Sequence, residues 1–135
     1  MKKRTKKVKR KRKKAKKRTK RKGGKILVNI AKRSLITLPN EKGFKFYLDI
    51  NRPTSIMANS LQSFIDGLKR VELSSIRFHM SRGDFSKWVS NSLNDKFLAK
   101  NLLSLKKLNG EVLRKSLIHR VETRYNTLKK ALEKK

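Results

Sequence analysis

Residues 111–132 read EVLRKSLIHRVETRYNTLKKAL and carry the clearest periodic pattern in the chain. Because an α-helix turns once every ~3.6 residues, apolar residues spaced three or four apart share one face. We therefore predict an amphipathic helix over 111–132 whose apolar stripe is buried. The stripe consists of Leu113, Leu117, Val121, Tyr125, Leu128 and Leu132.

The residues of this helix that lie away from the stripe are mostly basic. They include Lys115, His119, Arg120, Lys130 and Lys134. A helix that buries one face presents its other face to solvent or to a partner. We predict that the Lys and Arg side chains of this face contact an anionic partner.

Four shorter segments upstream also show helical spacing of apolar residues. Thr54 or Ser55, just after Pro53, can cap the first helix by accepting a backbone N–H bond. Ser74 or Ser75 can cap the second helix in the same way. The apolar positions are Met57, Leu61, Phe64, Ile65 and Leu68; Ile76 and Phe78; Phe85, Trp88, Val89 and Leu93; and Leu98, Ala99, Leu102 and Leu105.

Stop and start signals separate these helices. Gly83 can take the left-handed conformation that ends a helix, and Asp84 can cap the helix that follows. Asn94-Asp95 is another cap signal, and Asn109-Gly110 ends the segment before the last helix. Together the segments predict a mainly α fold, a small bundle of about five helices over 55–132.

Residues 26–50 have the features of extended chain. The apolar run at 26–30 predicts a short strand, and 44–50 alternates apolar and polar residues with the period of a half-buried strand. The segment 39–43, PNEKG, has turn-forming residues between them. We predict a short hairpin that packs against the helices, since two strands alone are marginally stable.

Residues 2–25 read KKRTKKVKRKRKKAKKRTKRKGGK, and 18 of these 24 residues are Lys or Arg. A segment with so little to bury cannot offset the entropy of ordering. We predict a disordered polybasic tail over 1–25, ahead of one domain over 26–135. The tail residues predicted to contact nucleic acid are Lys2, Lys3, Arg4, Lys6, Lys7, Lys9, Arg10, Lys11, Arg12, Lys13, Lys14, Lys16, Lys17, Arg18, Lys20, Arg21, Lys22 and Lys25.

The charge of the whole chain points to an anionic partner. Formal net charge is +31, and 26–135 alone holds 22 Lys and Arg against nine acids. Such an excess attracts nucleic acid or an anionic surface. The absence of Cys excludes disulfides, a thiol nucleophile and zinc sites with thiolate ligands. No apolar run is long enough for a membrane span or a secretory signal.

The segment 75–88 reads SIRFHMSRGDFSKW, and it is followed by LNDKFLA at 93–99 and GEVLR at 110–114. These motifs resemble the signature S-I-x-F-H-x-x-R-G-D-F-x-x-W of an uncharacterised, mostly archaeal family of small helical domains. The resemblance covers about 44–132 and implies a helical fold and an archaeal origin. It implies no particular activity, and the tail lies outside it.

His79 and Asp84 are the only candidates for a catalytic pair in this signature. A general base needs a His beside a carboxylate and a pocket that admits a substrate. A structural role, with His79 partly buried in a helix and Asp84 as a cap, is favoured. No metal-binding pattern and no phosphate-binding Gly-rich loop accompany them, so neither a metal nor another cofactor is expected.

Aromatic residues offer a candidate surface for stacking on nucleic-acid bases. Phe78, Phe85 and Trp88 could form one, but their helical spacing favours the hydrophobic core. Tyr47, on the polar face of the predicted strand, is a better candidate for a stacking contact.

The sequence therefore predicts a non-enzymatic protein that binds DNA or ribosomal RNA, largely without sequence specificity. The tail and the basic last helix would bind phosphates, which position a protein but do not discriminate bases. The expected location is cytoplasmic, at the nucleoid or the ribosome, or nuclear in a eukaryote. The alternatives are a protein-interaction module tethered to nucleic acid by its tail, a small enzyme using His79 and Asp84, and a membrane-surface binder, which ranks last.

Overall fold

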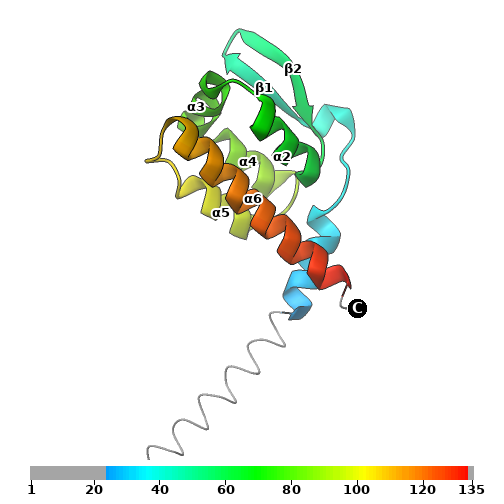
Figure 1. Cartoon of the computed structure of the whole chain (residues 1–135). Helices are drawn as coiled ribbons and strands as arrows, with labels where there is room; N and C mark the ends of the chain where they lie inside the picture. The colour runs from blue at the N-terminus through cyan, green and yellow to red at the C-terminus, as the bar shows by residue number, and fades with distance from the viewer. Residues whose placement is uncertain (1–23, 134–135) are drawn as a thin grey trace, which may run out of the picture.

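The computed structural model describes residues 24–133 (Figure 1). Within this range most of the chain is α-helical, and one two-stranded sheet lies at one end of the molecule. The predicted mainly α fold is confirmed, with six α-helices in the described range where about five were predicted. The predicted tail up to residue 23 and Lys134 lie outside the described residues.

The first described segment is a helix over 24–34, and the strand predicted at 26–30 is wrong. Ala31 and Ser34 are buried and Leu27 is half-buried, which is helical spacing. The β-branched residues of the run favour a strand locally, but this propensity is weaker than the packing of a helical face. The Ser34 hydroxyl donates to the carbonyl of Leu93 at 2.6 Å, which attaches the helix to the rest of the domain.

The hairpin is formed by β1, Phe44–Asp49, and β2, Arg52–Ala58, which pair antiparallel. A 3₁₀ turn, η1 at Asn40–Lys42, precedes it where the sequence predicts a turn. The strand predicted at 44–50 is therefore confirmed as Phe44–Asp49, but its partner is β2, which follows it in the chain, and not the segment 26–30. Asn51 N–H donates to the Asp49 carboxylate at 3.0 Å and closes the tight turn between the strands.

The position of β2 corrects the prediction that a helix begins at Thr54 or Ser55. Pro53 lacks an N–H but is tolerated in β2, because an edge strand need not donate at every residue. Met57 consequently lies in a strand and not on a helical face. The helix begins after Ser60, whose side chain accepts from Ser63 N–H in a capping box.

Five helices follow the hairpin, and most of their predicted boundaries are confirmed. Gly83 ends one helix with a φ of 72°, and Asp95 caps another by accepting from Leu98 N–H at 3.1 Å. The cap predicted at Ser74 or Ser75 is wrong by two or three residues, since Glu72 precedes that helix and Ser75 is buried. The helices are α2 Leu61–Arg70, α3 Leu73–Arg82, α4 Asp84–Asn91, α5 Lys96–Leu103 and α6 Gly110–Glu133.

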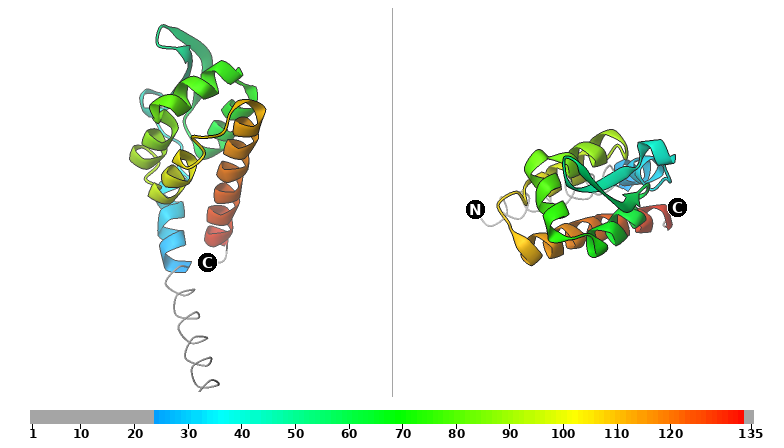
Figure 2. Two further views of the ribbon diagram at one scale, coloured as in Figure 1. Left: turned by 90° about the vertical axis from the view of Figure 1, so that its left-hand side faces the viewer. Right: turned by 90° about the horizontal axis from the view of Figure 1, so that it is seen from above.

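The long helix α6 runs along most of the domain (Figures 1 and 2). It packs against α2, α3 and α5, while α2 and α3 also support the hairpin and α4 packs on α5. The helix 24–34 lies beside the C-terminal end of α6 in both views. The predicted stripe is confirmed: four of its side chains are buried and Tyr125 and Leu132 are half-buried.

An aromatic core joins the hairpin to the helices. Phe44 of β1 contacts Phe64, Phe85 and Trp88 with ring centroids 5.3–6.0 Å apart. The predicted core positions Phe85 and Trp88 are thus confirmed, whereas Phe78 is only half-buried. Because the Trp88 indole N–H donates to the Lys42 carbonyl at 3.0 Å, its polar atom is satisfied within the core.

A glycine in α2 permits the close approach of the hairpin. A Cβ on Gly67 would lie 2.6 Å from a ring carbon of Phe46, well inside van der Waals contact. Any larger residue would push α2 away from β1. The absence of a side chain at this position therefore sets the distance between the helix and the sheet.

Candidate nucleic-acid interface

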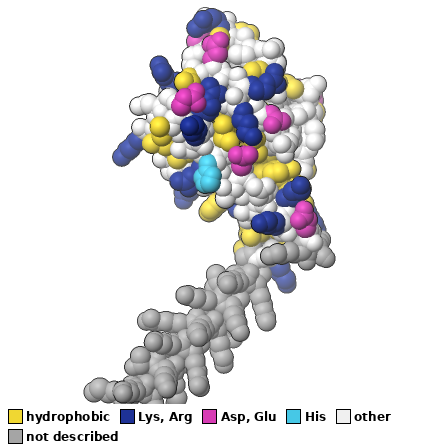
Figure 3. Space-filling model, viewed as in Figure 1, with side chains coloured by type: hydrophobic (Ala, Val, Ile, Leu, Met, Phe, Trp, Pro, Cys, Tyr) yellow, Lys and Arg dark blue, Asp and Glu magenta, His cyan; other side chains and the backbone are white. Residues whose placement is uncertain are grey.

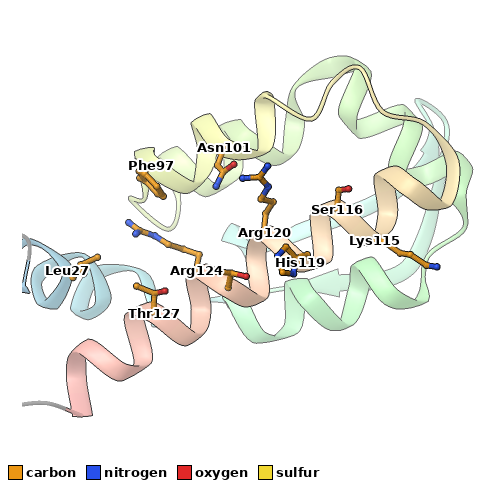
Figure 4. A pocket seen from close by; sticks show the side chains of 10 residues that line it. Leu27, Phe97, Asn101, Lys115, Ser116, His119, Arg120, Arg124 and Thr127 are labelled. Atoms are coloured by element: carbon orange, nitrogen blue, oxygen red, sulfur yellow. The ribbon is translucent and has the colours of Figure 1, made fainter.

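An open groove of about 870 Å³ lies between α5 and α6 (Figure 4). The helix 24–34 contributes one residue, α5 two, and α6 the rest. The polar character of its walls follows from local sequence, because both α5 and α6 bury an apolar stripe and leave polar residues beside it. The lining residues are Leu27, Phe97, Asn101, Lys115, Ser116, His119, Arg120, Thr123, Arg124 and Thr127.

The lining of this basic groove carries one sign of charge. Lys115, Arg120 and Arg124 are cationic, and none of the described lining residues is acidic. Figure 4 shows the Arg120 guanidinium reaching toward Asn101 of α5, across the groove. Walls of one sign focus the electric field and raise the local concentration of anions. Hydroxyl and amide groups on the same walls can donate to phosphate oxygens.

Arg124 binds an acid behind the groove wall and is not free for a ligand. Its Nε and Nη2 donate to the two oxygens of Asp95 at 2.8 and 3.0 Å, and both side chains are buried. Asp95 also caps α5, so one carboxylate holds both the start of α5 and the middle of α6. This pair fixes the spacing of the two helices that form the groove.

Phe97 lies over the outer side of this ion pair. The Arg124 guanidinium carbon is 4.5 Å from the centroid of its ring, a cation–π contact. The ring is nevertheless 63% exposed, because α5 turns it away from the core. The groove therefore combines positive charge with an accessible aromatic surface.

The basic residues predicted as binding residues are only partly brought together. Lys115 and Arg120 both line the groove, whereas Lys130 is exposed on α6 outside the lining. Lys25 is exposed at the start of the helix 24–34, whose Leu27 lines the groove. The other predicted tail residues and Lys134 lie outside the described range.

Phe97 and Arg124 are not among the residues predicted from the sequence, although both break the pattern of their helix. Phe97 precedes the stripe of α5 by one residue, and such an aromatic residue off the buried stripe is a signal of exposure. Arg124 occupies a position in phase with Val121 and Leu128, where an apolar residue is expected. A charge at such a position is a signal of a buried partner.

Elsewhere the basic side chains are spread over the surface. On the face shown in Figure 3, Lys and Arg are interspersed with Asp, Glu and apolar side chains. Several acids among the described residues pair with cations, as Glu122 does with Lys69 at 3.5 Å. A mixed surface of this kind is a weaker anion attractor than a groove of one sign.

His79 and Asp84, the candidate catalytic pair, are in contact. The Nδ1 of His79 lies 2.9 Å from the Asp84 carboxylate, while its Nε2 accepts from Tyr47 N–H at 2.9 Å. Because Nε2 accepts, Nδ1 carries the proton and donates to Asp84. Asp84 is the first residue of α4 and makes no side-chain cap bond, so the predicted cap role is wrong. The carboxylate instead binds His79 and Arg82.

This pair lines a second hollow of about 650 Å³, which also includes Tyr47, Phe78 and Lys87. Burial lowers the pKa of His79, an effect that Arg82 reinforces and Asp84 opposes. The ring is thus held neutral, with both nitrogens bonded inside the protein. This arrangement joins α3, α4 and β1, and it leaves no ring nitrogen available to accept a proton from a substrate.

Two further features bear on function. Within residues 24–133, no three His, Asp or Glu side chains gather as a metal site would require. No helix in the same range is both long and apolar enough to cross a membrane.

The fold and the groove define a small, mainly helical domain with a groove whose described charged lining residues are all basic. The chain belongs to the Family of unknown function (DUF5752), whose model matches residues 40–135. This match agrees with the extent of the resemblance found in the sequence, about 44–132. The helix 24–34 and the polybasic segment, residues 2–25, precede the matched region. No curated protein and no solved structure matches the chain.

Proposed function

We propose that this protein binds nucleic acid non-enzymatically and largely without sequence specificity, through its polybasic segment and the basic groove. The observation that carries the proposal is that positive charge is concentrated both in the polybasic segment, residues 2–25, and in the adjoining groove. Eighteen of residues 2–25 are Lys or Arg, and the groove lining adds Lys115 and Arg120 without any acid among its described residues.

The two places are neighbours along the chain. Residue 24 begins the described helix whose Leu27 lines the groove, so the polybasic segment joins the domain at this site. A phosphate backbone that occupies the groove beside Leu27 would lie close to the start of that helix. Binding at both places then acts as bivalent attachment, which raises affinity without new base contacts.

Counterion release supplies the driving force. Each phosphate neutralised by Lys or Arg frees a condensed cation, and on duplex DNA log K falls with log salt by about 0.9 per contact. Phosphate contacts position a protein but do not discriminate bases. The protein is therefore expected to bind many sequences, tightly at low salt and weakly at high salt.

The finer predictions made from sequence remain proposals. We propose an association with either DNA or ribosomal RNA, in the nucleoid or at the ribosome, or in the nucleus of a eukaryote. An archaeal origin, implied by the motif over 75–88, has the same status. The alternative of a tethered protein-interaction module also remains a prediction.

The test measures dissociation constants for a labelled duplex over a range of salt concentrations. Deleting residues 2–22 should weaken binding and flatten the salt dependence, by about 0.9 for each phosphate that the shortened chain no longer neutralises. The double variant Lys115→Gln/Arg120→Gln should do the same to a smaller extent, with a slope change of about 2.

A matched double variant, Lys106→Gln/Lys107→Gln, removes the same charge from exposed residues outside the groove. It should change affinity less than the groove variant does. Wild-type affinity and slope after deletion of 2–22 would contradict the role of the polybasic segment. Equal losses of affinity from the two double variants would contradict the role of the groove.

A further inference from the structure

We propose that the basic groove binds single-stranded nucleic acid, with an unpaired base stacked on Phe97 and phosphates of the same strand on Arg120 and Lys115. This inference rests on the proposed function and adds a ligand class to it. It makes one part of the binding depend on an exposed base, and not only on charge.

The first support is the exposure of Phe97 at this place. A phenyl ring that is 63% exposed leaves most of its apolar surface in water, although α5 has a buried stripe beside it. Exposed apolar groups are common when scattered singly, but this ring lines a groove that also carries cations. Aromatic rings in positively charged grooves are the usual stacking surfaces for single strands.

The second support is that the ring is held in place. Arg124 lies 4.5 Å from the ring centroid and is itself fixed by two bonds to the buried Asp95. Asp95 caps α5 through Leu98 N–H, immediately beside Phe97. A pre-positioned ring loses little freedom when a base stacks on it, so more of the stacking energy appears as affinity.

The third support is the chemistry and size of the groove. Ser116, Thr123, Thr127 and Asn101 supply hydroxyl and amide groups that can bond to sugar or base edges. The volume of about 870 Å³ lies within the range of roughly 300–1,000 Å³ typical of small-molecule sites, so a nucleotide fits. Figure 4 shows Phe97 at one end of the groove and Lys115 toward the other.

These features favour single strands over duplexes. Bases in a duplex are stacked on one another, and withdrawing one for an external ring costs the free energy of unstacking and unpairing it. A single strand has no such cost, because its bases can be splayed out onto an aromatic surface. The polybasic segment, by contrast, would contact phosphates, which single strands and duplexes both present.

The test compares Phe97→Leu, which keeps an apolar side chain but removes the aromatic face, with the wild-type full chain. The probes are labelled single strands of about 16 nucleotides, as RNA and as DNA, and a duplex of the same length. Phe97→Leu should weaken single-strand binding roughly tenfold and leave duplex binding unchanged. Phe97→Trp should restore single-strand affinity. Comparing the RNA and DNA strands identifies which nucleic acid the groove prefers.

The matched control is Leu103→Ala, a 45%-exposed apolar residue of the same helix that lies outside the groove lining. It should change neither the affinity for the single strands nor the affinity for the duplex. Unfolding curves of Phe97→Leu check that the fold is kept. Unchanged single-strand affinity, or equal losses of affinity for single strand and duplex, would overturn the stacking inference alone. Failure of the wild-type chain to bind any of the probes would overturn the proposed function as well.

Discussion

At the scale of single residues, His79 shows how a polar group is accommodated in an aromatic core. Its ring contacts Phe44 at 4.7 Å between centroids, and both of its nitrogens are bonded inside the protein. Its partners come from β1 and α4, so one side chain connects three elements. The sequence indicates the His79–Asp84 pair but not the Tyr47 bond, because that contact depends on where β1 lies.

Lowering the pH should destabilise the fold through His79. Burial lowers its pKa below the ordinary value of 6.5, so the folded state resists a proton that the unfolded state accepts. Above pH 6.5 the His79 ring is neutral in both the folded and the unfolded state, so its contribution to the free energy of unfolding is constant. Below it, the free energy of unfolding should fall until the pH passes the pKa of the folded state.

Urea unfolding over a series of pH values measures this effect. His79→Gln should lower stability at neutral pH, because it disturbs two bonds, and should flatten the pH dependence just below 6.5. His119→Gln, which changes an exposed His on α6, is the matched control variant. If the free energy of unfolding of His79→Gln falls as steeply with pH as that of the wild type, His79 is not the source of the pH dependence.

At the scale of elements, α5 and α6 are joined by the buried pair of Asp95 and Arg124. A buried ion pair offsets its desolvation only when its geometry is good and its remaining bonding groups are satisfied. Here two short bonds join the side chains, and Asp95 also accepts from Leu98 N–H. The arrangement therefore sets the relative position of the two helices that form the groove.

Arg124→Met should destabilise the domain by about 3–5 kcal/mol, because it leaves the Asp95 carboxylate buried without its partner. The double variant Asp95→Asn/Arg124→Met should recover part of this loss, since Asn can still cap α5 and no charge remains buried. Urea unfolding at neutral pH measures both changes.

The control is Lys69→Met, which removes an exposed ion pair with Glu122. It should cost at most about 1 kcal/mol. If Arg124→Met is no more destabilising than this control, the buried pair does not hold α5 to α6.

At the scale of the whole molecule, the polybasic segment and the domain are expected to be energetically separate. The hydrophobic core is built from residues after 34, together with the helix 24–34 that packs on it. Deleting residues 2–22 removes 17 positive charges and leaves a net charge of +14. Less self-repulsion slightly favours the compact state.

We therefore expect deletion of 2–22 to change the free energy of unfolding by less than about 0.5 kcal/mol, measured by thermal or urea unfolding. Deletion of 2–34 is the matched comparison. It also removes Ala31, which is buried, and the Ser34–Leu93 bond, so it should be clearly destabilising. A large loss of stability from the shorter deletion would show that the polybasic segment is part of the folded domain.

Features that depend on neighbours along the chain can be predicted from the sequence alone. The stripe of α6, the helix end at Gly83 and the cap at Asp95 all follow from local periodicity or local backbone conformation. The net charge, and with it the expected class of partner, follows from composition. Local rules suffice here because each feature is decided within one or two helical turns.

Which local tendencies prevail, and which side chains meet, depends on the tertiary structure. The run at 26–30 favours a strand but is helical, because packing of its Ala31 side outweighs propensity. Residues 52–58 contain the predicted helix start at Thr54 or Ser55, but they form β2 and pair with β1. The basic groove unites Leu27, Phe97 and Arg120, residues up to 93 positions apart, and no local pattern encodes such proximity. The physical reason is that packing energy is shared among distant segments, and only the folded chain brings them into contact.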